Sequence, residues 1–302
     1  MVRYFLKPDF VDIKLLEKLR NKYKKIVFFN GNAGGGIHRP EVLPYVDFFF
    51  NKSLFLDRRI YGRELYGGEL YSDYYHKKYS IEDGEEKVTP PILNHEDFAK
   101  LRLSWNVGIG EFPRHKYRQR FGVAAARMVG IHGARLFMRE NRLKEPRNRG
   151  EYPMNARLGY QSRESITYQR RLHMEKLDSL DGVLTGKVNQ KQFNREIYNS
   201  QIIYSPFGWG ELCFRDFEAL MSGALLIKPD MSHLETWPDI FIPFETYVPV
   251  RWDGEDLVET CKKYLSNKKE RDRITRNGWN HYLKQEDQLP LRFKTAMEEV
   301  LS

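Results

Sequence analysis

The segment from residue 155 to residue 265 alternates short apolar runs with helix-like stretches, and this alternation constrains the fold more than any other feature. Strands are expected at 155–160, 182–188, 201–205, 224–228 and 247–250. Helices are expected at 162–177, 190–199, 211–222 and 256–265. Strands separated by helices of this length form a parallel sheet that helices cover on both faces.

The first 150 residues show a second, less regular α/β pattern. Strands are expected at 24–30, 46–50 and 101–107, and the first of them runs into the glycine-rich sequence GNAGGG. Residues 58–78 are rich in tyrosine and glycine without a helical or strand period, so we expect an irregular aromatic loop there. Residues 121–129 are expected to be helical, and the charged stretch 139–152, which contains Pro and Gly, has the composition of a linker.

The length of the chain, 302 residues, suits two domains of ordinary size. We place them at 1–150 and 151–285, followed by a C-terminal helix at 286–302. Ligands of such α/β sheets bind at the carboxyl ends of the strands. This rule predicts that residues 30–36 and 205–210 face a ligand.

The charge of the chain points to an anionic partner. The formal net charge is +9, which suits a nucleic acid, an anionic membrane surface or a phosphorylated small molecule. No run of about 18 apolar residues occurs, so no membrane span is expected. The N-terminus lacks the apolar core of a signal peptide. Cys213 and Cys261 have neither metal-ligand nor disulfide spacing, which fits a reducing compartment, and we expect a cytoplasmic protein.

The most informative stretch is 205–229, SPFGWGELCFRDFEALMSGALLIKP. The expected helix 211–222 is mostly apolar, but one stripe along it is polar: Glu211, Arg215, Glu218 and Ser222. Because unpaired buried charge is costly, this stripe must face either solvent or a ligand. An exposed face with a Glu211–Arg215 ion pair is the plainer interpretation. The preceding Gly-Trp-Gly favours a ligand, since glycines allow close approach and the free N–H groups of a helix N-terminus bind phosphate.

The same stretch resembles the nucleotide-sugar half of GT-B glycosyltransferases, in particular the exostosin-like and group 1 transferases. The resemblance rests on a strand ending in Ser-Pro-x-Gly, then Phe-Arg-x-x-Glu-Ala-Leu, a small residue with Gly, and a buried strand. It implies that Arg215 contacts the diphosphate, that Glu218 binds the ribose, and that Gly208 and Gly210 form a close-approach loop. It also implies two Rossmann-like domains facing a cleft, with the acceptor on the N-terminal domain and a C-terminal helix crossing back to that domain.

The expected chemistry requires no metal and no cofactor other than the donor substrate itself. Displacing a nucleoside diphosphate from an anomeric carbon builds negative charge, which fixed cations and helix N-termini stabilise. The predicted nucleotide-sugar-binding residues are Arg163, Lys187, Pro206, Gly208, Trp209, Gly210, Glu211, Arg215 and Glu218. For each arginine alone, a solvated surface charge is the alternative.

A transfer that inverts the anomeric centre also needs a base for the acceptor hydroxyl. His38 follows the glycine-rich loop and is the first candidate for this catalytic role, with a structural histidine as the alternative. Asp73, in the tyrosine-rich segment, is its rival, and Asp57 is a weaker third. The residues expected to bind the acceptor are Gly34, Gly35, Gly36, Arg39 and Tyr71.

These features together predict a hexosyl- or pentosyltransferase of glycan biosynthesis. It would move a sugar from a UDP- or GDP-sugar to an oligosaccharide or glycoprotein hydroxyl, with no nucleic-acid partner. Two alternatives stay open. One is a basic nucleic-acid-binding protein, because basic and aromatic residues mix in stretches such as RHKYRQRF. The other is a sugar- or nucleotide-binding module of the same fold without turnover.

Overall fold

The computed structural model describes residues 6–7, 10–84, 88–106, 116–130, 132–133, 145–160 and 162–302. The chain divides into two compact units. Met1–Asn106 and Pro146–Ser302 form the larger unit, and Val107–Glu145 form the smaller one. Within the smaller unit, helix α4 (Lys116–Val129) ends at Gly130, whose φ of +75° is the left-handed conformation common after a helix. The predicted domain division near residue 150 stays a prediction.

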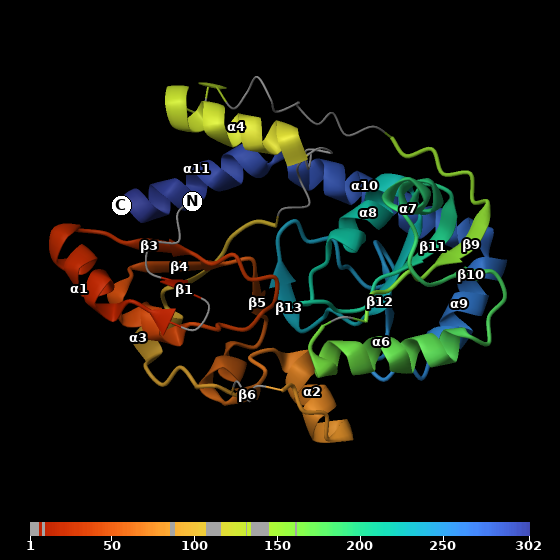
Figure 1. Ribbon diagram of the computed structural model, residues 1–302, viewed down its shortest axis with the longest axis horizontal. Coiled ribbons are helices and arrows are strands. Elements are labelled where there is room, and N and C mark those ends of the chain that lie inside the picture. Colours follow the sequence, from red (N-terminus) through yellow and green to blue (C-terminus); the bar gives the residue numbers. More distant parts are fainter. Residues whose placement is uncertain are drawn as a thin grey trace. The chain divides into compact units, whose positions relative to one another are not determined.

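A three-stranded parallel sheet forms the N-terminal half of the larger unit (Figure 1). Its strands are β3 (Val27–Phe29), β4 (Phe48–Asn51) and β8 (Leu101–Leu103), in the order β3-β4-β8. The phenylalanines of the sheet pack on each other, and the rings of Phe29 and Phe50 stack with their centroids 4.8 Å apart. Helix α1 (Ile13–Lys22) begins where Asp12 accepts a hydrogen bond from the Leu15 N–H, and it buries Leu16 in the same core.

Five parallel strands form the sheet of the C-terminal half. They are β9 (Tyr152–Asn155), β10 (Val183–Leu184), β11 (Ser200–Tyr204), β12 (Leu225–Pro229) and β14 (Val248–Val250). Their order is β10-β9-β11-β12-β14. Every residue of β12 is buried, as expected for a central strand with helices on both faces.

Helices cover both faces of this second sheet. They are α6 (Glu164–Leu177), α7 (Gln190–Ile197), α8 (Phe214–Ser222), α9 (Leu257–Ser266) and α10 (Lys268–Asp287). Helices α6 and α9 pack together, as do α7 and α8 (Figure 1). The predicted α/β class, with two Rossmann-like parallel sheets, is therefore confirmed.

Small elements surround the two sheets. They are β1 (Leu6–Lys7) with β2 (Phe10–Val11), η1 (Pro40–Tyr45), β5 (Ser53–Phe55), η2 (Arg58–Gly62), β6 (Leu65–Tyr66) with β7 (Val88–Thr89), α2 (Leu70–Tyr79), α3 (His95–Phe98) and β13 (Leu234–Thr236). Strand β5 pairs antiparallel with β13, so main-chain hydrogen bonds join the N-terminal and C-terminal halves of the larger unit.

The last helix, α11 (Leu289–Leu301), contacts the N-terminal half of the larger unit at the end of β8. The Arg102 Nε lies 2.6 Å from Glu299 Oε1, and Arg292 donates to the Leu103 carbonyl at 3.0 Å. The rings of Trp105 and Phe293 lie edge to face, with centroids 5.5 Å apart. These contacts attach the C-terminal end of the chain to the first sheet.

Three expectations about local structure are wrong, and two of them concern the site. The strand expected at 155–160 is β9, which ends at Asn155. The aromatic segment 58–78 is not an irregular loop: it contains η2, β6 and most of α2, because Tyr71 and Tyr75 are buried on one side of that helix. The helix expected over 211–222 begins only at Phe214, because Asp216 accepts a hydrogen bond from the Cys213 N–H and caps the helix there. Glu211 therefore precedes the helix and shares no helical stripe with Arg215 and Glu218.

Candidate active site

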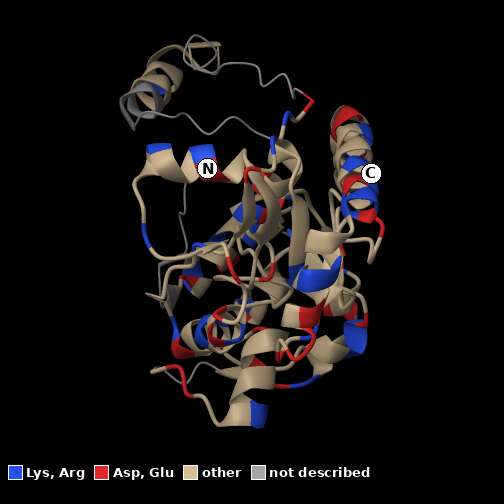
Figure 2. Cartoon of the chain, turned by 90° about the vertical axis from the view of Figure 1, so that its right-hand side faces the viewer, with Lys and Arg blue, Asp and Glu red and all other residues tan. Residues whose placement is uncertain are grey.

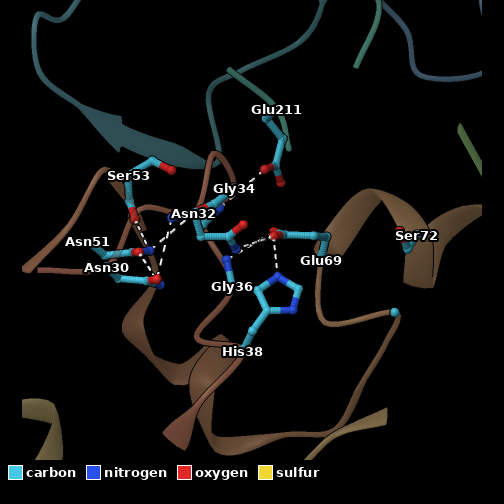
Figure 3. A network of polar contacts seen from close by, with 12 residues as sticks. Asn30, Asn32, Gly34, Gly36, His38, Asn51, Ser53, Glu69, Ser72 and Glu211 are labelled. Carbon is cyan, nitrogen blue, oxygen red and sulfur yellow. Dashed lines mark hydrogen bonds and ion pairs between the residues drawn. The ribbon is translucent and has the colours of Figure 1, made fainter. Parts of the chain in front are cut away.

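The glycine-rich loop 30–36, which follows β3, lies between two buried carboxylates (Figure 3). Glu69, at the start of α2, reaches the loop from the N-terminal half of the larger unit, and Glu211 reaches it from the C-terminal half. The Gly36 N–H donates to Glu69 Oε2 at 3.0 Å, and the Gly35 N–H donates to Glu211 Oε2 at 3.2 Å. Two consecutive amides thus bind two different carboxylates, one from each half.

The loop glycines are required by close packing. A Cβ on Gly34 would lie 2.1 Å from Glu69 Oε1, and one on Gly36 would lie 1.7 Å from the Gly68 carbonyl oxygen. A Cβ on Gly210 would lie 2.3 Å from the carbonyl carbon of Ala33. The Leu212 N–H also donates to the Ala33 carbonyl at 3.2 Å. The glycines expected to approach a ligand are therefore in close contact with other parts of the chain itself.

His38 forms a pair with the buried Glu69. Its Nε2 lies 2.6 Å from Glu69 Oε1, and Asn32 Nδ2 donates to the same oxygen at 3.1 Å. The side chain of Glu69 is fully buried, whereas that of His38 is about one-third exposed. An ionised carboxylate only accepts hydrogen bonds, so it selects the tautomer in which Nε2 carries the proton and Nδ1 can accept one. Glu69 thus fixes the orientation of the His38 ring, and its role as a base stays a prediction.

Glu211 makes a comparable but more enclosed pair with His233. Its Oε1 lies 3.4 Å from His233 Nε2, and the carboxylate is fully buried. Burial raises the pKa of Glu211, and the nearby charge of Glu69 raises it further. His233 Nδ1 is buried and has no hydrogen-bond partner within the described residues.

Tyr71 connects α2 to the loop that follows β11. Its hydroxyl donates to the Gly208 carbonyl at 2.9 Å and accepts from Arg163 Nη2 at 3.1 Å. Arg163 also donates to the Gly67 carbonyl at 3.0 Å and lies 5.7 Å from the centre of the Trp209 ring, which is two-thirds exposed. Four of the predicted residues, Tyr71, Arg163, Gly208 and Trp209, are therefore brought together.

Several buried nitrogens near this loop have no hydrogen-bond partner in the described parts of the chain: Asn155 Nδ2, Arg163 Nε, Gln169 Nε2 and Arg170 Nε. Arg170 approaches the Phe207 carbonyl at 3.4 Å, and burial lowers the pKa of its guanidinium. Unsatisfied N–H donors in a buried position favour an acceptor-rich ligand, because each unpaired donor costs about 1–3 kcal/mol. Phosphate oxygens are such acceptors.

Arg215 and Glu218 lie on α8, away from the glycine-rich loop. Arg215 donates to the Arg157 carbonyl at 2.6 Å and sits 5.9 Å from the centre of the Phe193 ring. Burial lowers the pKa of Arg215 and raises the pKa of Glu218, and the two opposite charges partly offset both effects. Arg170 donates to the Gly159 carbonyl, so Arg170 and Arg215 both bind the connection between β9 and α6.

The remaining predicted residues are dispersed. Lys187 is exposed after β10, and Arg39 Nη1 lies 3.9 Å from Glu41 Oε1. Asp73 is buried on α2, where it accepts from Lys77 Nζ at 2.7 Å and from the Tyr66 N–H at 3.3 Å. Pro206 is buried at the end of β11, and its carbonyl accepts from the Cys213 thiol. Their predicted ligand roles stay predictions.

Sequence reasoning missed Glu69, Asn32 and His233. Glu69 follows Gly67 and Gly68, both with positive φ, and it directly precedes the first residue of helix α2. A glycine pair followed by an acidic residue and a helix is a recognisable turn. Its partners lie 31 to 37 residues away in sequence, so the sequence alone did not indicate the contact.

Among the described residues, no group of three or more His, Cys, Asp or Glu side chains is arranged to hold a metal ion. In the same part of the chain, no helix combines the length and apolarity needed to cross a bilayer.

Comparison with known proteins supports the predicted class. Residues 165–288 match the family described as "Glycosyl transferase-like"; the match runs from α6 to α10 and leaves out β9 of the second sheet. The match covers less than half of the chain and supports a glycosyltransferase in general; the resemblances to group 1 and to exostosin-like transferases stay predictions. No curated protein sequence is significantly similar to the chain.

Two solved structures illustrate the similarity. One is the C-terminal domain of a glycosyl transferase group 1 family protein (LpcC) from Francisella tularensis, with 15% identity, 46% of this chain and 87% of that chain covered, and a TM-score of 0.31. The other is an alpha-glucosyltransferase in complex with UDP-glucose and DNA containing an abasic site. It has 11% identity, 96% of this chain and 76% of that chain covered, and a TM-score of 0.40.

Proposed function

We propose that this protein transfers a sugar from a nucleoside-diphosphate sugar, of the UDP or GDP type, to a hydroxyl of a glycan acceptor. One observation carries the proposal. The glycine-rich loop leading to the His38–Glu69 pair touches Gly210 and Glu211 of a second loop, and that loop is bordered by half-buried arginines. A base and a set of diphosphate-binding cations are what displacement at an anomeric carbon requires.

The donor would bind between the β9–α6 connection and the loop 205–210. Arg163, Arg170 and Arg215 supply positive charge for the diphosphate, and the amide nitrogens of Asn155 and Gln169 supply further donors. The exposed Trp209 ring offers a flat surface for the base or the sugar. Glu218 is the proposed ribose ligand. With cations and amides available for the leaving group, the proposed reaction uses no metal.

The acceptor would bind on the side of the glycine-rich loop. Its hydroxyl proton passes to His38 Nδ1 while its oxygen bonds to the anomeric carbon. The bond from that carbon to the diphosphate oxygen breaks, and the nucleoside diphosphate leaves with the electron pair. A single displacement of this kind inverts the anomeric centre. Glu69 holds the imidazole in the required tautomer and stabilises the imidazolium that forms. Asp73 is the alternative base.

Nucleotide binding is the direct test of the donor site. We expect UDP or GDP to raise the melting temperature of the wild-type protein in a saturable way at moderate salt. Arg170→Ala should reduce the affinity about tenfold or more, because a charged hydrogen bond contributes about 1.5–3 kcal/mol. Arg171→Ala, an exposed arginine one residue further along α6, is the matched control. Equal nucleotide affinities for the two variants would show that Arg170 does not bind the donor.

A transfer assay tests the base. Turnover in the presence of a UDP- or GDP-sugar and an oligosaccharide acceptor should fall strongly in His38→Ala and less in Asp73→Asn. The opposite order would assign the base to Asp73. Normal turnover in both variants would exclude both residues.

A further inference from the structure

The positive charge of the chain is concentrated in the smaller unit. Val107–Glu145 contain nine Lys or Arg residues and three Asp or Glu residues, so 39 residues carry +6 of the total of +9. Residues 112–139 contain seven Lys or Arg residues and no acidic residue. Helix α11, by contrast, carries charges of both signs (Figure 2). The smaller unit, therefore, has a charge distribution unlike that of the rest of the molecule.

Helix α4 within this unit also exposes apolar side chains. Met128 is 85% exposed and Val129 is 66% exposed. Helical spacing places positions 121, 124, 125 and 128, occupied by Phe, Ala, Ala and Met, along one side of the helix. All four charged residues of α4 are basic: Lys116, Arg118, Arg120 and Arg127. The helix thus combines this apolar stripe with charges of one sign.

This combination fits an anionic lipid surface better than a nucleic acid. A basic helix with an apolar side lies in the plane of the membrane interface, where the apolar side chains enter the headgroup boundary and the cations meet anionic headgroups. A phosphodiester backbone would bind the cations but would offer nothing to an exposed Met128 or Val129. The 14 residues of α4 are too short to span a bilayer, so the helix would lie flat.

We propose that helix α4 is a docking surface for membranes that contain anionic lipids. The partner is the bilayer surface itself, recognised by charge complementarity and by shallow insertion of the apolar stripe. The proposal does not depend on sugar transfer, since it rests only on the charge and the exposed side chains of the smaller unit.

Vesicle sedimentation with the full chain tests this surface. We expect the wild-type protein to sediment with vesicles of phosphatidylcholine containing about one-third phosphatidylglycerol, and to stay in the supernatant with phosphatidylcholine alone. Raising the salt to about 0.5 M should weaken binding without abolishing it, because only the electrostatic part is screened. Sedimentation with neither vesicle would overturn the proposal.

Two pairs of substitutions separate the contribution of charge to vesicle binding from that of the apolar side chains. Arg120→Glu with Arg127→Glu should lower the partition coefficient at least tenfold, since each basic residue near such a surface contributes about a fivefold factor. Met128→Ser with Val129→Ser should lower it about three- to tenfold at unchanged charge. The matched control is Lys262→Glu with Lys269→Glu, two exposed lysines of the larger unit, and it should bind as the wild type does.

Equal binding by all variants would overturn the proposal. A parallel titration with a fluorescent DNA or RNA oligonucleotide distinguishes the competing partner. If the Arg120 and Arg127 reversals abolish oligonucleotide binding while vesicle binding stays at the control level, α4 is a nucleic-acid surface and the lipid proposal is wrong.

Discussion

Buried carboxylates occur both beside the C-terminal sheet and at the glycine-rich loop. The groups that bind these carboxylates differ between the two places. In the sheet, Asp216 and Lys228 are fully buried, with Lys228 Nζ 3.1 Å from Asp216 Oδ1. At the loop, Glu69 and Glu211 are also fully buried, but their partners are histidines and main-chain amides. The Asp216 carboxylate thus faces a lysine ammonium inside the fold, whereas the two loop carboxylates face imidazoles and main-chain N–H groups.

We expect this difference to separate groups that stabilise the fold from groups that act on a substrate. Asp216 also accepts from the Ser205 hydroxyl and from the Cys213 N–H, so it fixes both ends of the loop 205–213. Lys228 donates to the Ser205 carbonyl. The His38 ring is about one-third exposed, and in the proposed reaction it takes the proton of the acceptor hydroxyl. The comparison predicts large stability effects in the sheet and large activity effects at the loop.

The largest effect is expected for Lys228→Met. Removing the cation leaves the buried Asp216 carboxylate with hydrogen bonds from Ser205 and Cys213 but no opposite charge, which costs about 3–5 kcal/mol of unfolding free energy. Urea unfolding measures the loss. The double variant Asp216→Asn with Lys228→Met should recover part of it, because no buried charge then remains. A loss below about 1 kcal/mol in the single variant would contradict the assignment of this pair to the core.

The next largest effect is a dependence of the unfolding free energy on pH, and it comes from His173. The imidazole is fully buried, its Nε2–H donates to the Trp252 carbonyl at 2.9 Å, and burial lowers its pKa to about 4. The unfolded chain takes up this proton near pH 6.5, so the stabilisation is complete above that pH and is lost as the pH falls toward 4. The loss amounts to about 3 kcal/mol at about 1.4 kcal/mol per pKa unit.

Unfolding free energies measured between pH 7 and pH 4 check this prediction. The slope of stability against pH should become flatter in His173→Gln. The exposed His132→Gln should keep the wild-type slope. A wild-type slope in both variants would mean that His173 titrates normally in the folded protein.

Glu69→Gln is expected to act on turnover more than on folding. The amide of Gln can donate to His38 Nε2, which moves the ring proton to Nδ1 and removes the acceptor for the substrate proton. The rate of transfer should fall about 100-fold or more, with little change in KM. Glu64→Gln, in an exposed position, is the control. A Glu69→Gln variant with a normal rate and a normal pH profile would reduce the His38–Glu69 pair to a structural contact.

The smallest effect is expected for Tyr71→Phe. The substitution removes the hydroxyl between Arg163 and the Gly208 carbonyl, which should cost about 1–2 kcal/mol of stability. Thermal unfolding measures it. Tyr168→Phe, on a half-buried ring, should stay within about 0.5 kcal/mol of the wild type. Equal values for the two variants would show that the Tyr71 hydroxyl contributes nothing to the contact between its neighbours.

The C-terminal sheet could be predicted from the sequence because its signals are local. The apolar runs that became β11 and β12 are continuous, and the left-handed Gly223 ends α8 before β12. Helix α2 was missed because its alternation of buried and half-exposed tyrosines does not separate apolar from polar residues. Both Tyr71 and Tyr75 are buried, whereas Tyr74 is only half-buried.

The site was only partly predictable because its contacts join distant segments. His38 and the glycine-rich loop were identified from their position after a strand, but Glu69, which orients His38, comes from another element. Glu211 was placed on a helix because its spacing to Arg215 and Glu218 is helical. The cap formed by Asp216 overrides that spacing and moves Glu211 toward the Gly35 amide.

The contact between Gly210 and Ala33 has a kinetic consequence. Main chain rests directly on main chain at this point, with the Leu212 N–H bonded to the Ala33 carbonyl, so no substrate atom fits between the two strips of backbone. A substrate that bridges His38 and the arginines through this point would have to separate the two segments first. Entry of such a substrate and release of its product would then depend on the same contact, and a methyl group added at Gly210 would force the two segments apart.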